Sequence, residues 1–210
     1  MVTQSQVLAW LDRYADLIAE QREYLTELDA AIGDADHGIN MNRGFQKVKS
    51  QLPTMADKDI GSILKNTGMA LLSSVGGASG PLYGTLFMRA GMKVDKKQAL
   101  TADDLLALLQ GGLEGVIQRG KSQVGDKTMI DAFQPAVEGY EAATHAGKSV
   151  VEALTEAADA AEAGRDATLP LIARKGRASY LGERSKDHLD PGATSLAMLI
   201  RTLAESAAEG

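Results

Sequence analysis

The sequence predicts an all-α protein, with about eight antiparallel helices arranged as an up-and-down bundle or helical barrel. Apolar residues recur at three- and four-residue spacing in most long segments, and no segment alternates apolar with polar residues as a half-buried strand does. Aromatic residues are only 4% of the chain while hydrophobic residues are 44%, so the core must be mainly aliphatic, which favours helices. With 210 residues and no internal repeat, we expect one domain over residues 1–210.

The N-terminal half is expected to contain four helices and one acidic loop. Ser5 can cap the first helix, and that helix or a second one leads into the acidic stretch at residues 28–44. This stretch is predicted to be a loop, because Gly33 and Gly38 give the backbone the freedom of a turn. Further helices are expected over residues 41–52 and 58–75.

The C-terminal half offers clearer helix starts. Thr101 with Asp104 approximates a capping box, and Asp126 or Thr128 can cap the helix after it. Asp190 followed by Pro191 is an economical start for the last helix. The expected helices cover residues 83–92, 101–117, a segment after 128, 149–164 and a segment after 191. Their glycine-rich or acidic junctions could gather at one end of the bundle.

The acidic stretch is a candidate metal site. Asp29, Asp34 and Asp36 can converge in a loop, and carboxylates without a nearby thiolate suit Mg²⁺ or Ca²⁺. A Mg²⁺ ion with open coordination positions usually binds phosphate there. A solvated Asp-rich turn is the alternative. An EF-hand is excluded, because a loop begun at Asp34 would place Ile39 and Phe45 where glycine and glutamate are required.

Two further segments are candidate phosphate contacts. The glycines of residues 71–84 would let backbone amides approach an anion at the start of a helix, although a flexible turn explains them equally well. This stretch has neither the Walker pattern nor GxGxxG. Arg177 lies in a basic run and has the fork geometry that matches phosphate, whereas a solvated charged face is the alternative.

Composition excludes several classes of function. A net charge of −6 and the lack of a basic patch interleaved with aromatics make nucleic acid an unlikely partner class, so we expect none. The chain has no cysteine and no apolar run of about 18 residues, and its N-terminal residues lack a signal-like core. We therefore expect a cytoplasmic protein with no membrane partner.

Five motifs together resemble one family. They are GDADHG at residues 33–38, SSVGGASGP at 73–81, GDKT at 125–128, RKGRASYLGERS at 174–185 and DPGATS at 190–195. In this order and spacing they closely resemble the nucleotide-binding L subunit of bacterial dihydroxyacetone kinase. Each motif is weak alone, but five in register are specific, and the resemblance spans nearly the whole chain.

The resemblance implies an eight-helix up-and-down barrel that holds ADP or ATP and two Mg²⁺ ions at one rim. It implies that Asp29, Asp34 and Asp36 ligate the Mg²⁺ pair, and that Arg177 stabilises phosphate without any residue acting as a nucleophile. The nucleotide contacts that it implies are His37, Gly38, Ile39, Asn40, Ala78, Ser79, Gly120, Thr128, Met129, Arg177, Asp190, Pro191 and Gly192.

The resemblance also implies partners. A γ-phosphoryl group would pass to dihydroxyacetone held on a histidine of a separate K subunit. A free-standing chain of 210 residues resembles the phosphoenolpyruvate phosphotransferase-dependent type, in which bound ADP is rephosphorylated by a phosphocarrier M subunit. In some members the ADP-loaded subunit also acts on a transcription regulator.

Three alternatives stay open on the sequence. One is an ATP-dependent kinase module of a related glycerone or fatty-acid kinase. The second is a non-catalytic helical module whose aspartate loop holds a structural metal ion. The third is a lipid carrier that uses an apolar barrel interior, a function for which Asp29 would be dispensable.

Overall fold

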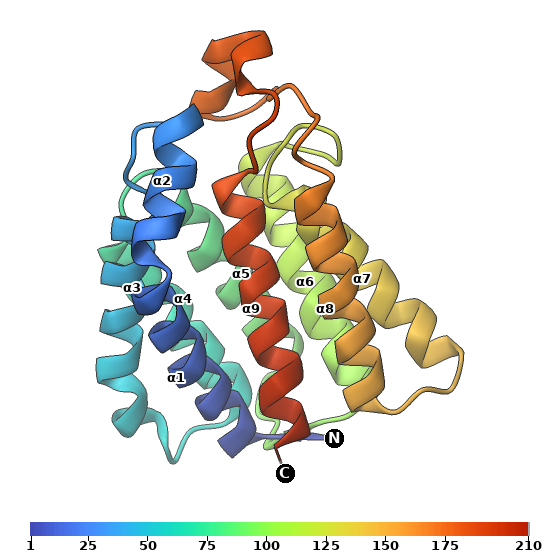
Figure 1. Cartoon of the computed structure of the whole chain (residues 1–210). Coiled ribbons are helices and arrows are strands. Elements are labelled where there is room, and N and C mark those ends of the chain that lie inside the picture. The colour runs from blue at the N-terminus through green and yellow to red at the C-terminus, as the bar shows by residue number, and fades with distance from the viewer. Residues whose placement is uncertain (210) are drawn as a thin grey trace.

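The computed structural model describes residues 1–209, which fold into a helical barrel (Figure 1). Gly210, the last residue of the predicted domain, lies outside the described residues. The α-helices are α1 Gln4–Glu20, α2 Arg22–Ile32, α3 His37–Gln51, α4 Ile60–Ser74, α5 Ser79–Lys93, α6 Ala102–Gly120, α7 Ile130–His145, α8 Val150–Asp166 and α9 Pro191–Ala208. Two 3₁₀ segments, η1 Leu52–Met55 and η2 Arg177–Ser185, and two short strands, β1 Val2–Thr3 and β2 Ala99–Leu100, complete the described elements.

The helices form a closed ring in chain order. From α3 onward each helix packs against the next one, and α9 returns to pack against α1, as the red and dark blue ribbons of Figure 1 show. Only Gln21 separates α1 from α2, so these two helices act as one long bent rod. The described chain therefore has eight rods that run alternately up and down, and the predicted fold class is confirmed.

Aromatic side chains pack the interior between α1, α3 and α5. Phe45 contacts Tyr14, Tyr83 and Phe87 with ring centroids 4.6, 6.3 and 6.1 Å away. Trp10 packs on Phe87 at 5.8 Å. Edge-to-face pairs of this kind stabilise a core beyond the burial of their area. Side chains thus fill this part of the barrel, which argues against a lipid-filled interior.

Buried hydrogen bonds close the seam between the first and last helices. The indole nitrogen of Trp10 donates to the carbonyl of Leu199 at 3.0 Å. The hydroxyl of Tyr14 donates to the carbonyl of Ser195 at 2.9 Å. Because these donors are buried, the pairs also avoid the cost of leaving polar groups unsatisfied. The start and the end of the described chain are thereby held together.

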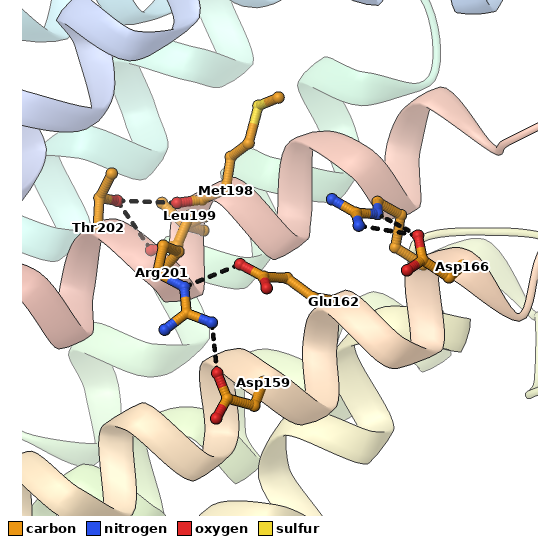
Figure 2. Close-up of polar contacts among 8 residues, drawn as sticks. Asp159, Glu162, Asp166, Met198, Leu199, Arg201 and Thr202 are labelled. Carbon is orange, nitrogen blue, oxygen red and sulfur yellow. Dashed lines mark hydrogen bonds and ion pairs between the residues drawn. The ribbon is translucent and has the colours of Figure 1, made fainter.

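Ion pairs join α9 to α8 on the outer face. Figure 2 shows Arg201 of α9 directed toward Asp159 and Glu162 of α8, with nitrogen–oxygen distances of 2.5 and 2.8 Å. The two carboxylates raise the pKa of Arg201, and the hydrogen bond that Arg201 donates to Glu162 contributes most. Beside it, Asp166 at the end of α8 accepts from Arg165.

Several predicted boundaries are corrected. Thr3 rather than Ser5 caps α1, because its side chain and that of Gln6 form a reciprocal capping box. Met129, without a side-chain cap, precedes α7 instead of Asp126 or Thr128. The paired strands β1 and β2 were not expected, since two residues are too short for an alternating pattern. The capping box of Thr101 with Asp104 and the cap of Asp190 are confirmed.

The acidic loop is also shorter than predicted. Asp29 lies in the last turn of α2, and His37 already begins α3, so only residues 33–36 are non-helical. Similarly, α5 begins at Ser79 rather than near Tyr83. Both differences shorten the connections and hold their side chains on helix ends.

Four junctions lie at the same end of the barrel. They connect α2 with α3, α4 with α5, α6 with α7, and α8 with α9, and the last one carries η2 across the end of the barrel at the top of Figure 1. The predicted gathering of the glycine-rich and acidic junctions therefore occurs. Within residues 1–209, no helix combines the length and apolar character that crossing a bilayer requires.

Candidate functional site

A cavity of about 530 Å³ lies at this end of the barrel. All four junctions contribute to its walls, and α6 adds its last turn. A cavity of this size can enclose a drug-sized ligand. Its polar lining residues are Asp29, Asp34, Asp36, His37, Ser79, Tyr83, Arg119, Ser122, Lys127, Thr128, Lys175, Arg177 and Asp190.

Three carboxylates form the acidic side of the cavity. One oxygen from each of Asp29, Asp34 and Asp36 can be chosen so that all three lie within 4.8 Å of one another. Asp29 is buried, whereas Asp34 is exposed and Asp36 is half-buried, so the cluster opens toward solvent on one side. Hard oxygen donors in this arrangement fit Mg²⁺ and leave room for water or ligand oxygens.

Backbone contacts fix the carboxylate of Asp29. Its Oδ2 accepts from the backbone amides of Asp36 at 2.8 Å and His37 at 3.1 Å. A Cβ at Gly33 would lie 2.0 Å from Oδ1 of the same carboxylate, so only glycine fits there. These bonds also satisfy amides at the start of α3 that lack helical partners, which explains why the helix begins at His37.

His37 is buried behind the acidic cluster. Its Nδ1 lies 3.0 Å from the hydroxyl of Ser79, and its Nε2 lies 2.9 Å from the hydroxyl of Ser195. Burial lowers the pKa of His37 to about 4, and the charge of Asp36 opposes this only partly. The imidazole is therefore neutral near pH 7.

The glycine-rich junction presents the start of α5 to the cavity. Gly77 has a φ of +63°, and a Cβ at Gly80 would lie 2.3 Å from the carbonyl oxygen of Val75. These two positions require glycine. They let the chain turn tightly so that Ala78 and Ser79 line the cavity at the N-terminus of α5. Free amides and the helix dipole at such a terminus favour an anion.

Basic side chains from the α6–α7 and α8–α9 junctions also line the cavity. Nε of Arg177 lies 2.8 Å from Oδ2 of Asp34, and both side chains are more than a third exposed. Lys127 is buried and donates to the backbone carbonyls of Thr168 and His188, so it holds the α8–α9 connection against the α6–α7 junction. Burial lowers the pKa of Lys127.

Two further aspartates shape the cavity from helix starts. Asp190 caps α9 by accepting from the amide of Ala193 at 2.7 Å, and burial raises its pKa to about 7. Asp131 in the first turn of α7 accepts from the amides of Gly125 at 2.6 Å and Thr128 at 2.7 Å. Asp131 thereby fixes the loop that carries Thr128 and Met129 into the cavity.

Most of the residues proposed from the sequence line this one cavity. They are Asp29, Asp34, Asp36, His37, Ala78, Ser79, Gly120, Thr128, Met129, Arg177, Asp190, Pro191 and Gly192. Gly38, Ile39 and Asn40 do not line it. In the first turn of α3, Gly38 packs against the backbone of Arg22 and Ile39 is 50% exposed, whereas Asn40 is buried close to Gly76.

Sequence reasoning missed several lining residues. Arg119, Lys127 and Lys175 add positive charge to the walls, and Tyr83 adds a buried hydroxyl. Lys127 stands inside the GDKT motif, so its position could have been suspected. Lys175 likewise stands inside the basic run that contains Arg177, whereas Arg119 carries no local signal, since only the fold brings it to the cavity.

Comparison with known proteins gives a consistent result. The DAK2 domain family matches residues 31–205. The PEP-dependent dihydroxyacetone kinase, ADP-binding subunit DhaL, of Escherichia coli (strain K12) is 53% identical over 208 residues, which cover 99% of each chain. A PEP-dependent dihydroxyacetone kinase 2, ADP-binding subunit DhaL, of Listeria innocua is 46% identical and is covered over 88% of its length by 90% of this chain.

A solved structure has a similar fold. The dihydroxyacetone kinase from C. freundii in complex with AMP-PNP and Mg²⁺ aligns with a TM-score of 0.74 at 30% sequence identity. The alignment covers 97% of this chain and 34% of that chain, so this chain spans about a third of that enzyme.

Proposed function

The chain belongs to the DAK2 domain family, and on this premise we propose that it is the ADP-binding subunit of a PEP-dependent dihydroxyacetone kinase. Residues 1–210 would be one nucleotide-binding domain, an assignment supported by the ring that α1 and α9 close. The cytoplasmic location expected from the sequence stays a prediction.

The observation that carries the proposal is the cavity at the end of the barrel. It combines three clustered carboxylates, a helix N-terminus suited to phosphate and an arginine next to the carboxylates. Asp29, Asp34 and Asp36 would hold the Mg²⁺ ions, for which we propose a pair. Bound Mg²⁺ would neutralise charge on the phosphate oxygens during transfer.

The remaining lining residues would hold the nucleotide. Ala78 and Ser79 would bind phosphate at the start of α5, while Gly120, Thr128 and Met129 would border the adenosine. Arg177 would release Asp34 to the metal and turn to the phosphates, where its guanidinium can stabilise developing charge. Gly38, Ile39 and Asn40 follow His37 in the first turn of α3 and are not part of the cavity lining, and their proposed contact with the nucleotide stays a prediction.

The phosphoryl acceptor would come from a partner. No residue of this cavity is needed as a nucleophile, because phosphoryl transfer depends mainly on positioning and charge neutralisation. We propose that a K subunit presents dihydroxyacetone at the open side of the cavity and that an M subunit rephosphorylates the ADP. The near-complete coverage of the free-standing DhaL relatives favours this arrangement over a single-chain ATP-dependent kinase.

A binding measurement with a metal-ligand variant tests the proposal. Asp34→Asn should weaken Mg²⁺-dependent ADP binding at least tenfold, roughly what loss of a metal-supporting residue costs. The control is Asp57→Asn, which changes an exposed carboxylate at the opposite end of the barrel and should bind as the parent does. Isothermal titration calorimetry with and without EDTA measures both, and circular dichroism checks the fold.

Other outcomes identify the alternatives. If the parent protein binds no ADP with Mg²⁺ but binds Ca²⁺ through Asp34, the chain is a structural metal-binding module. If bound nucleotide exchanges rapidly with free ATP and turnover needs no phosphocarrier, the ATP-dependent kinase is correct.

A further inference from the structure

A chain of hydrogen bonds runs from the barrel core to the cavity. The hydroxyl of Tyr83 lies 2.7 Å from Oγ of Ser195, and Oγ of Ser195 lies 2.9 Å from Nε2 of His37. On the other side of the ring, Nδ1 of His37 lies 3.0 Å from Oγ of Ser79. These hydrogen bonds therefore link α5, α9 and α3. They end on Ser79, the one of the four side chains that is not buried.

The inner members of this chain are enclosed by protein. His37 is 7% exposed, Tyr83 is 1% exposed and Ser195 is fully buried. Buried polar groups are costly when they lack a partner, so each donor and acceptor here needs a hydrogen-bond partner in one of the neighbouring side chains or in the backbone. This requirement restricts the order of the protons, that is, which atom of each hydrogen bond carries the proton.

Two orders of the protons fit the observed distances. A neutral imidazole has one donor and one acceptor nitrogen. In the first order, Nε2–H of His37 donates to Ser195 and Nδ1 accepts the proton of Ser79. In the second order, the hydroxyl of Ser195 donates to Nε2 of His37, and Nδ1–H donates to Oγ of Ser79.

The two orders leave the cavity with different chemistry. In the first order, the single proton of Ser79 is used inside the protein, and only lone pairs face the cavity. In the second order, the hydroxyl proton of Ser79 is free to point outward. Either hydroxyl of the Tyr83–Ser195 pair can donate. When Tyr83 donates, it favours the second order, because a hydroxyl that accepts a hydrogen bond becomes a better donor to the next member of a chain.

Ser195 has one competing acceptor, the carbonyl oxygen of Gly192. That contact is 3.1 Å long, compared with 2.9 Å to His37 and 2.7 Å to Tyr83. The contact of Ser195 with His37 is shorter than its contact with Gly192, and it is the contact with His37 that continues the hydrogen-bond chain toward the cavity.

We propose that Ser195 and Tyr83 are positioning residues that hold His37 with its proton on Nδ1, so that Ser79 donates its hydroxyl proton to an anionic oxygen in the cavity. An anionic oxygen can only accept, and the N-terminus of α5 at Ser79 favours an anion. The inference rests on the proposed function in one respect, namely that the anion is a phosphate of the nucleotide.

Two pairs of variants separate positioning from general packing. Ser195→Ala is matched by Ser206→Ala, because Ser206 is buried in the same helix and its hydroxyl has no hydrogen-bond partner among the described residues. Tyr83→Phe is matched by Tyr140→Phe, because Tyr140 is buried and donates to the backbone carbonyl of Ala102. Neither control residue lines the cavity.

Binding of ADP with Mg²⁺ should respond to one member of each pair. Ser195→Ala should weaken binding about three- to tenfold, the equivalent of one hydrogen bond, and Tyr83→Phe should weaken it by a smaller factor in the same direction. Both controls should stay within about twofold of the parent, as expected for a change remote from the ligand. In a Ser79→Ala background, Ser195→Ala and Tyr83→Phe should have no further effect, because the hydroxyl that they orient is gone.

Nitrogen NMR of labelled histidine gives a second readout that loss of packing alone would not change. With ADP and Mg²⁺ bound, His37 should show a protonated Nδ1 and an unprotonated Nε2. The other two histidines, His145 and His188, are exposed and can be removed by substitution with glutamine to assign the signals. This measurement uses the parent site, so it decides the question even if Ser195→Ala does not fold.

The results distinguish the two proposals. A parent protein that binds no ADP with Mg²⁺ contradicts the proposed function itself. A parent that binds ADP while His37 carries its proton on Nε2, or while Ser195→Ala weakens binding equally with and without Ser79, overturns the positioning chain and leaves the proposed function intact.

Discussion

Asp190 is a carboxylate that the fold buries at the start of its last helix. It lies in the wall of the cavity and accepts from the amide of Ala193, as an N-cap should. The hydrogen bond stabilises its charged form, but burial outweighs it and raises the pKa of Asp190 to about 7. In the nucleotide-free protein, Asp190 therefore keeps its proton up to about pH 7, whereas the unfolded chain releases it at a much lower pH.

We expect the substitution Asp190→Asn to change how stability depends on pH. Since the pKa of Asp190 is higher in the folded state, its protonation stabilises the fold at low pH, and this contribution is lost as pH rises through about 7. Asparagine caps helices equally well and has no such loss. Relative to the parent, the variant should gain roughly 2–3 kcal/mol of unfolding free energy between pH 5 and pH 8, given about 1.4 kcal/mol for each of the two pH units below the folded pKa.

Urea unfolding of the nucleotide-free protein at the two pH values measures this gain. His145→Gln, an exposed histidine far from the cavity, serves as the control and should not show it. Equal stability differences between parent and Asp190→Asn at pH 5 and pH 8 would mean that Asp190 is ionised throughout.

At the scale of the element, helix starts show what can be predicted from sequence. Thr101 and Asp190 cap their helices with their own side chains, so a local pattern identifies them. The start of α3 has no such cap: its amides are satisfied by Asp29, which belongs to the preceding helix. A search for a capping residue directly before the helix cannot find this contact. The sequence therefore predicts a loop that is longer than the observed one.

The same distinction holds for the candidate site. Asp29, Asp34 and Asp36 are close in sequence, so their convergence could be predicted from one short stretch. Arg119 shares the cavity with them only through the closure of the ring, and no local pattern points to it. The resemblance to a family added the adenosine border, Gly120, Thr128 and Met129, which residue chemistry alone does not reveal.

The contact between α8 and α9 makes a prediction at the same scale. Arg201 pairs with two carboxylates on the facing helix, and its side chain is 27% exposed. We expect Arg201→Gln to lower the unfolding free energy by about 1 kcal/mol, the upper end for pairs near the surface, and less at high salt. Lys148→Gln, which removes one exposed pair with Glu156, should lower the unfolding free energy by less than Arg201→Gln does.

Urea unfolding at low and high ionic strength measures both variants. If Arg201→Gln and Lys148→Gln lower the unfolding free energy by the same amount, the two-carboxylate arrangement in Figure 2 adds no stability beyond that of an ordinary surface pair.

At the scale of the whole molecule, the topology explains why distant motifs meet. In an up-and-down ring, every second connection lies at the same end, so four of the motif-bearing junctions converge although they are spread from residue 33 to residue 190. The connections at the other end, over residues 52–59, 94–101 and 146–149, carry no residue of the cavity lining. The two ends of the barrel therefore have separate roles.

This separation predicts which segments of the chain a bound ligand will stabilise. A ligand at 100 times its dissociation constant stabilises the folded state by about 2.7 kcal/mol, and ADP with Mg²⁺ should do so by contacting all four junctions at once. Amide hydrogen exchange should slow most over residues 33–37, 75–80, 121–130 and 167–190, because local opening there is suppressed by the ligand. The connections at the other end should exchange at unchanged rates, apart from any global effect.

Adding EDTA should reverse the protection at all four junctions together, since the proposed metal ligands lie in one of them and the phosphate and adenosine contacts in the others. Protection confined to residues 33–37 would show that metal binds without organising the cavity. Protection spread equally over both ends would show that the ligand stabilises the barrel as a whole and that the four junctions do not form one site.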